Sequence, residues 1–179
     1  GSCQPVRMSD AELRALHEVV DGWAATGTPL TFYTYNPSSG FAQAPYLAAR
    51  KFHDDMKWLH AHGFVGFHSQ SEGTLWGFYG LNHLSMARSL WDVDLGFDAL
   101  KEDYFRSLFG DAAEPVQALH EAFERALMER EPMPMQVVEL GSFLSPEVLA
   151  RAHRLLHEAR EAERSDAVQA RLDILAAQV

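Results

Sequence analysis

Residues 63–91, GFVGFHSQSEGTLWGFYGLNHLSMARSLW, carry the pattern that decides the fold. A short apolar run at 64–67 leads into the polar side chains of 68–72, and a long, almost uncharged helix follows from after Thr74 to about Trp91. This order predicts a buried strand that delivers polar residues to a loop, and then a helix that packs back on the sheet. Ligands of α/β proteins bind at such loops, at the carboxyl ends of strands. The sequence therefore predicts where a site lies.

The composition limits the classes of function. The chain has 179 residues, of which 47% are hydrophobic, as expected for one folded domain with a packed core. Its formal net charge of −10 leaves no basic run that could neutralise phosphates, so we expect no nucleic-acid partner. No apolar run reaches the roughly 18 residues that a membrane span needs, so we expect no membrane partner either.

The N-terminal segment and the cysteine content bear on the compartment and the redox state of the chain. The N-terminal segment lacks the apolar region of a signal peptide, and none is predicted in this chain. The localisation stays open, and a longer secreted or periplasmic parent protein is compatible with the sequence. The single cysteine, Cys3, excludes an internal disulfide.

A second strand precedes the deciding stretch. Residues 30–35 (LTFYTY) are β-branched and aromatic, which predicts a strand, and a helix is expected before them at about 10–25. That helix has an apolar stripe of Leu13, Leu16, Val20 and Trp23. The next helix is predicted from near Pro45 to just before Gly63. Strand, helix and strand in this order predict two parallel strands with a right-handed crossover.

The C-terminal half is expected to be all helical. Helices are predicted at about 95–109, 112–130, 145–164 and 166–177, and 135–144 is expected to be extended or irregular. Asp92 and Asp94 are expected to cap the first of these helices. The fold class is thus helix-rich α/β with only two strands. Two parallel strands alone leave unpaired edges, so the sequence has the pattern of part of a larger sheet.

Several motifs occur in order between residues 23 and 123. They are a tryptophan before the first strand (Trp23), an aromatic strand ending at Tyr35, HGFVGF followed by a Gln/Glu-containing loop, Leu-Trp-Asp-x-Asp at 90–94, and DALKEDYFRSLFGDAAEPV. In these motifs the chain resembles a large bacterial family of uncharacterised, glycoside-hydrolase-like proteins. The helix ending in Leu-Trp-Asp-x-Asp also resembles one in the bacterial α-glucuronidases. The chain departs from the family pattern at Val93, where a proline is common.

The resemblance implies the C-terminal portion of a (β/α)8, TIM-type barrel followed by an all-α extension. Residues 1–94 would hold the partial barrel, with 30–35 and 64–69 as its last two strands, and residues 95–179 would form the helical extension. A complete barrel needs about 250 residues. The chain would then lack the first five or six strands, either because it is a truncated piece or because these elements serve in a smaller fold.

Glu72 is the candidate catalytic residue. It follows the carboxyl end of a strand, where a general acid or a ligand of a sugar hydroxyl would lie. The alternative is a solvated loop carboxylate that favours the next helix N-terminus. Glycoside hydrolysis usually needs two carboxylates about 5–10 Å apart. No second acid follows the first strand, so a partner carboxylate would have to come from a missing part or another chain.

The other candidate site residues are aromatic or polar. They are Tyr33, Tyr35, Asn36, His68, Gln70 and Trp76. Tyr33 and Tyr35 share one face of their strand, as His68 and Gln70 do on theirs, because strand side chains alternate. Aromatic rings with amide and imidazole groups suit a sugar, which has an apolar face and hydroxyls. The alternative is core packing for the aromatic residues and a structural role for His68.

No metal or cofactor is expected. The chain has nine histidines but no HExxH or Cys/His spacing, and His60 and His62 are expected at a solvated helix end. The sequence predicts a fragment of a carbohydrate-active, glycoside-hydrolase-like protein that is not catalytically competent alone. The alternative is a non-catalytic, helix-rich binding or assembly module. Under both, unpaired strand edges favour a homo-oligomer or a missing N-terminal half of the barrel.

Overall fold

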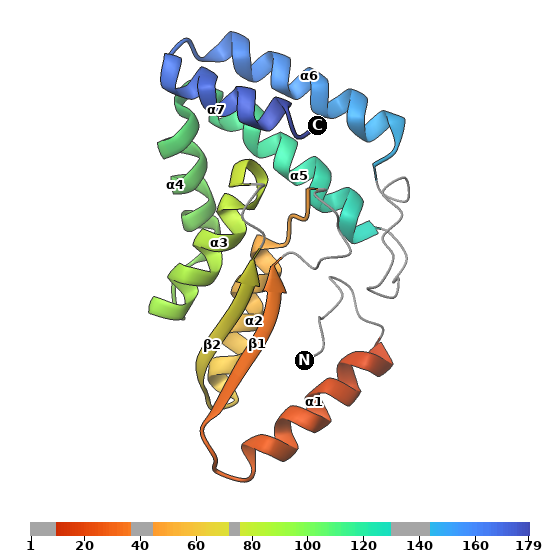
Figure 1. Ribbon diagram of the computed structural model, residues 1–179, viewed down its shortest axis with the longest axis vertical. Helices are drawn as coiled ribbons and strands as arrows, with labels where there is room; N and C mark the ends of the chain where they lie inside the picture. Colours follow the sequence, from red (N-terminus) through yellow and green to blue (C-terminus); the bar gives the residue numbers. More distant parts are fainter. Residues whose placement is uncertain (1–9, 37–44, 72–75, 130–143) are drawn as a thin grey trace.

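The chain folds as a helix-rich α/β protein (Figure 1). A computed structural model describes residues 10–36, 45–71, 76–129 and 144–179. Its N-terminal part contains α1 (Asp10–Ala24), β1 (Leu30–Asn36), α2 (Ala49–Ala61), β2 (Phe64–Ser71) and α3 (Trp76–Trp91). Its C-terminal part contains α4 (Phe97–Phe109), the 3-10 turn η2 (Gly110–Ala112), α5 (Ala113–Glu129), α6 (Pro146–Ala162) and α7 (Asp166–Ala176). The predicted stretch 135–144 lies mostly outside the described residues.

The two strands pair in parallel, which confirms the predicted strand-helix-strand unit. Tyr33 lies opposite His68, and Tyr35 lies opposite Gln70. Gly63, with φ at +80°, makes the tight turn from α2 into β2, as its position in the sequence predicts. α2 covers one face of this small sheet, and no helix of the described residues covers the opposite face over the carboxyl half of the strands (Figure 1).

α2 begins at Ala49, and not near Pro45 as the sequence predicts. Residues 45–48 are instead a buried, non-helical segment held by α3. The side chain of Asn82 accepts a hydrogen bond from the Ala48 N–H (3.1 Å) and donates one to the Tyr46 carbonyl (2.7 Å). The backbone before α2 thus takes its hydrogen bonds from a side chain, and these contacts favour a later start for the helix.

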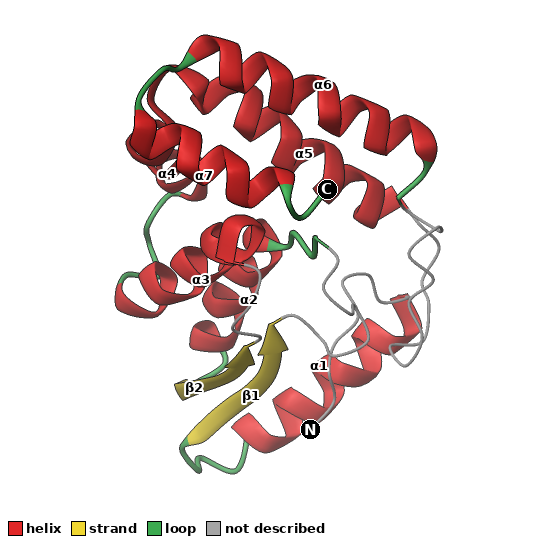
Figure 2. Cartoon of the chain, turned by 45° about the horizontal axis from the view of Figure 1, so that its top comes forward, coloured by secondary structure: helices red, strands yellow, loops and turns green. Residues whose placement is uncertain are grey.

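The helices of the C-terminal part pack on α3. Figure 2 shows α5, α6 and α7 side by side on the far side of α3 from the strands. Phe78 of α3 meets Phe123 of α5 edge to face, with ring centroids 5.4 Å apart. One hydrophobic cluster runs from the segment before α2 to α7, so the helical part and the strand-containing part share a core. Ser145 caps α6 by accepting a hydrogen bond from the Val148 N–H at 3.3 Å.

One prediction about helix capping is wrong. Asp92 and Asp94 do not cap α4, because the capping residue is Gly96 and the Asp92 carboxylate accepts a hydrogen bond from the Asp94 N–H (3.0 Å) in a local turn. The apolar stripe of α1 is buried at Val20, which is 5% exposed, whereas Leu13 is 42% and Trp23 is 60% exposed. The ring of His17 on α1 stacks on that of Trp58 near the end of α2, with ring centroids 4.6 Å apart.

Gly80 of α3 marks a close approach between helices, and we expect Gly80→Ala to lower the free energy of unfolding by about 1–2 kcal/mol. A Cβ at this position would lie 2.5 Å from the hydroxyl oxygen of Tyr104, a buried residue on α4. Urea denaturation measures the change. Gly22→Ala on α1, where no atom lies within 4 Å, is the matched control and should cost nothing. Tyr104→Phe should restore stability to the Gly80→Ala protein, and a failure to do so would contradict a clash with the hydroxyl.

Candidate functional site

The candidate site is the sheet face that α2 does not cover. Phe32 and Phe67 stack with centroids 6.2 Å apart on the side of α2. Because side chains alternate along a strand, their neighbours Tyr33 and His68 point to the opposite side. The structure therefore places the predicted pairs of residues from the two strands on one common face.

Four of the predicted site residues contact one another on this face. The hydroxyl of Tyr33 donates a hydrogen bond to the side-chain oxygen of Gln70 at 2.8 Å. The ring of Tyr33 stacks on that of His68 with centroids 5.3 Å apart, and it meets Tyr35 edge to face at 5.1 Å. We call Tyr33, Tyr35, His68 and Gln70 the aromatic face.

The aromatic face is accessible. Tyr33 is 36% exposed, His68 and Gln70 are exposed, and Tyr35 is partly buried. The rings offer apolar surface, and the imidazole and the amide offer hydrogen-bond donors and acceptors next to it. This combination suits a planar or ring-shaped ligand with polar substituents. The described residues of this face include no carboxylate.

Two predicted residues lie at the limit of the described chain. Asn36 ends β1 opposite Ser71 at the end of β2, at the carboxyl edge of the sheet. The side chain of Asn36 and the whole of Glu72 lie outside the described residues. The predicted catalytic role of Glu72 therefore stays a prediction.

Trp76 is placed elsewhere than the sequence predicts. Trp76 is the first residue of α3, and the centroid of its ring lies 4.6 Å from that of His83, about two helical turns further along α3. Together with Tyr104 and Leu108 of α4 these residues line a groove of about 580 Å³ between α3 and α4. Trp76 is 61% exposed, so it is neither a core residue nor part of the aromatic face.

The histidines have separate structural surroundings. His53 is buried, its ring stacks near Phe97 (5.7 Å), and desolvation by burial lowers its pKa. His62, expected at a solvated helix end, is half-buried: its Nδ1 lies 2.7 Å from the Trp58 carbonyl, and its Nε2 lies 3.6 Å from Asp21 on α1. Within the described ranges, no three histidine, cysteine or acidic side chains come together to hold a metal ion.

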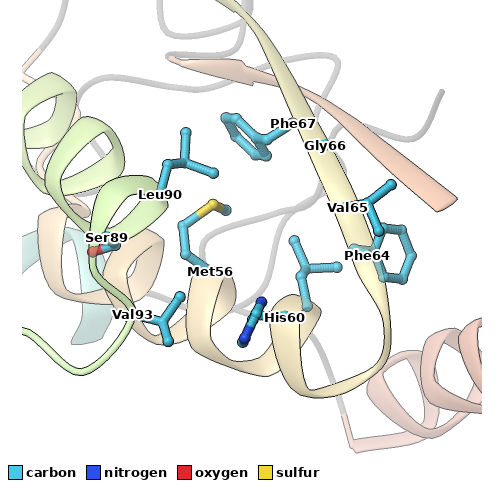
Figure 3. Close-up of a pocket in the computed structure, with 10 residues that line it drawn as sticks. Met56, His60, Phe64, Val65, Gly66, Phe67, Ser89, Leu90 and Val93 are labelled. Carbon is cyan, nitrogen blue, oxygen red and sulfur yellow. The ribbon is translucent and has the colours of Figure 1, made fainter. Parts of the chain in front are cut away.

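The sequence analysis missed a pocket behind β2. It has a volume of about 270 Å³ and lies between α2, β2 and α3 (Figure 3). The side chains of Met56, Phe67 and Leu90 point toward one another across it, and Val93 lies beside them. Two features of the sequence together indicate such a pocket. The apolar helix ends in two large apolar residues, Leu90 and Trp91, and the strand before it is predicted to pair with one other strand only.

Three comparisons with known proteins give no relative. No protein-family model, no curated protein and no solved structure matches the chain. A search of the described helices for one long and apolar enough to cross a membrane also finds none. The function must therefore be inferred from the geometry of the chain itself.

Proposed function

We propose that the chain is a carbohydrate-binding part of a glycoside-hydrolase-like protein, with the aromatic face as its sugar-binding surface. The observation that carries this proposal is the contact set on the open side of the sheet: Tyr33 bonded to Gln70, stacked on His68 and packed against Tyr35. A sugar ring stacks its apolar face on an aromatic ring and exchanges hydrogen bonds with amides and imidazoles.

The finer proposal is that β1 and β2 are neighbouring strands of a (β/α)8 barrel of this class. Three features support it: the strands are parallel, α2 crosses between them on one side, and aromatic and polar residues lie on the other side. In a barrel the helix-free side faces the interior, and ligands bind at the carboxyl ends of the strands. Asn36, Gln70 and Glu72 belong to that end on this proposal.

Turnover by these units alone is not proposed. Glu72 is the proposed general acid, and the described part of the aromatic face offers no second carboxylate for it. Because glycoside hydrolysis in most families needs two, the second would come from further strands of the barrel. Glu72→Gln should then abolish hydrolysis by a polypeptide that contains the complete site.

The first test is sugar binding to the chain itself. We expect glucose, xylose, N-acetylglucosamine, glucuronic acid or one of their disaccharides to bind with a Kd on the order of 1 mM, typical of one shallow stacking surface. NMR signals of the His68 ring should shift in a saturable manner during the titration. Tyr35→Ala should weaken binding about fivefold, because a stacking ring contributes roughly 1 kcal/mol.

The matched control for the binding surface is a second exposed histidine. His68→Ala should weaken binding, whereas His60→Ala, at the end of α2 and away from the aromatic face, should leave it unchanged. Signals that do not respond at about 50 mM of any sugar tested, or equal effects of the two histidine variants, would contradict the proposal.

A second candidate function is a non-catalytic assembly module. The observation that favours it is the exposure of large apolar residues on α3: Trp76 is 61%, Leu90 50% and Trp91 91% exposed. Stable protein interfaces bury at least about 1,000 Å². Light scattering of the purified chain at several concentrations tests this second candidate, because an assembly module requires a defined oligomer in the absence of sugar, and a monomer at every concentration would contradict it.

A further inference from the structure

The groove between α3 and α4 has the size of a small-molecule site. Its volume is about 580 Å³, and nine residues line it, five on α3 between positions 76 and 87 and four on α4 between positions 103 and 108. Small-molecule sites measure about 300–1,000 Å³. A stable protein interface uses roughly 20–30 residues on each partner, far more than these nine. The groove therefore matches a small molecule in size.

Much of the groove lining is apolar or aromatic. Trp76 is 61% exposed, and the centroid of its ring lies 4.6 Å from that of His83. Leu84 and Leu108 also line the groove and are only partly buried, although they pack against the shared core. The lining thus offers a ring-shaped ligand apolar surface, together with an indole that stacks on rings and attracts cations.

A buried hydroxyl of the groove lining makes no hydrogen bond to the described residues. Tyr104 is 8% exposed, and its hydroxyl reaches α3 at Gly80, where a Cβ would lie 2.5 Å from it. Desolvation by burial raises the pKa of Tyr104 to about 12, and no hydrogen bond contributes to this shift. The hydroxyl is therefore neutral at pH 7. Buried polar groups normally have a partner, which a ligand in the groove would provide.

The charged group of the groove lining is the carboxylate of Asp103. It accepts a hydrogen bond from the Ser107 hydroxyl at 3.3 Å, and within the described ranges no basic side chain pairs with it. Arg106, on the same helix, pairs with Glu102 instead. Neither lysine nor arginine lines the groove, and burial lowers the pKa of His83, which keeps its imidazole neutral at pH 7. The groove lining thus carries one negative charge, which favours a cation.

We infer that the groove between α3 and α4 binds a small organic cation in which an aromatic ring carries a protonated amine. The ammonium group has N–H donors only, and the Asp103 carboxylate and the Tyr104 hydroxyl are both acceptors for them. The ring lies on the apolar lining beside Trp76. A carboxylate in place of the amine is repelled by Asp103, and a neutral alcohol leaves that charge without a counter-ion. The inference needs no sugar binding, and it goes beyond the proposed function in assigning a second site with its own class of ligand.

Three probes that differ in one terminal group test the class of ligand. Phenethylamine carries an ammonium, 2-phenylethanol a hydroxyl and 3-phenylpropanoate a carboxylate on the same ring and linker. We expect phenethylamine to bind with a Kd on the order of 1 mM, measured as a saturable shift of the indole N–H signal of Trp76 in NMR spectra. Trp76→Phe identifies this signal by its loss. The alcohol should bind about fivefold more weakly than the amine, and the carboxylate at least about tenfold more weakly.

Two exchanges of aspartate for asparagine form a matched pair of variants. Asp103→Asn should weaken the binding of phenethylamine about fivefold and leave that of 2-phenylethanol unchanged. Asp94→Asn removes the same charge at an exposed position outside the groove, so it should change neither. Unchanged binding of the alcohol also shows that the variants keep their fold. Tyr104→Phe, which removes the buried hydroxyl alone, should weaken the binding of phenethylamine about fivefold.

Three outcomes overturn the inference. They are an unchanged Trp76 signal at about 20 mM phenethylamine, equal binding of the amine and the carboxylate, and equal binding of phenethylamine by the Asp103→Asn and wild-type chains. His68→Ala should not change the binding of phenethylamine, and Asp103→Asn should not change the binding of sugar. A failure of this inference is therefore distinguishable from a failure of the proposed function.

Discussion

Asn82→Leu is expected to lower the free energy of unfolding by about 3 kcal/mol, because it removes the side chain that holds the segment before α2. Asn82 is fully buried in α3. Its amide accepts a hydrogen bond from the Ala48 N–H and donates one to the Tyr46 carbonyl. Leucine fills a similar volume but pairs with neither group. Each buried backbone group left without a partner costs about 1–3 kcal/mol.

Two measurements check this expectation. Urea denaturation gives the free energy of unfolding, and amide hydrogen exchange should show faster exchange at Ala48 than in the wild type. Ser85→Ala is the graded control, since it removes a single hydrogen bond from the Ser85 hydroxyl to the Ala49 carbonyl (2.7 Å) and should cost about 1 kcal/mol. If Asn82→Leu costs no more than Ser85→Ala, the anchoring role of Asn82 is wrong.

The strand-containing part was predictable because its signals are local. Alternation at 30–35 and 64–69 determines which side chains share a face, and this placed Tyr33 with His68 and Tyr35 with Gln70 correctly. Gly63 is predictable from the positive φ that the turn into β2 requires. The (β/α)8 origin of these strands rests on a resemblance and stays a proposal.

The packing of α3 was less predictable because its apolar residues surround the helix. Trp76 and Leu90 are exposed, whereas Asn82, Ser85 and Ser89 are fully buried against the start and the middle of α2. The buried polar residues recur at intervals of three and four, which marks one helical face. The sequence of α3 alone does not show whether this face is exposed to water or packs against the hydrogen-bonding groups of another segment. For the same reason, the sequence could not show that Trp76 lies between α3 and α4 and not on the aromatic face.

The second prediction concerns the stability of the chain at acidic pH. The chain should lose about 3 kcal/mol of its free energy of unfolding between pH 6.5 and pH 4 through His120 alone. This residue lies in α5 with 4% of its surface exposed, between the rings of Phe78 and Phe105 at 5.2 and 4.9 Å. Its Nδ1 lies 3.0 Å from the Val116 carbonyl, and its buried Nε2 has no hydrogen-bond partner in the described chain.

The sign of this effect follows from the pKa. Desolvation by burial lowers the pKa of His120 from 6.5 to about 4. Between these two values the unfolded chain binds a proton that the folded chain does not bind, so stability falls as the pH falls and levels off below about pH 4. Burial also lowers the pKa of His53 and His83, which adds to the loss, and it raises the pKa of Asp55 and Glu124, which opposes it.

A comparison of variants isolates the share of His120. His120→Leu should flatten the fall in stability between pH 6.5 and pH 4 by about 3 kcal/mol in urea denaturation. His153→Gln is the matched control: His153 makes the same contact to the carbonyl four residues before it (Nδ1 to Leu149 O, 2.8 Å) but is exposed on α6, so its replacement removes this contact without removing a buried imidazole. The NMR titration of the His120 ring in the wild type provides a readout that needs no variant, and a midpoint near pH 6.5 would refute the assignment. Because His120 packs between α3, α4 and α5, protonation at low pH should open the shared core at the point where the helical part meets α3, and not at the aromatic face.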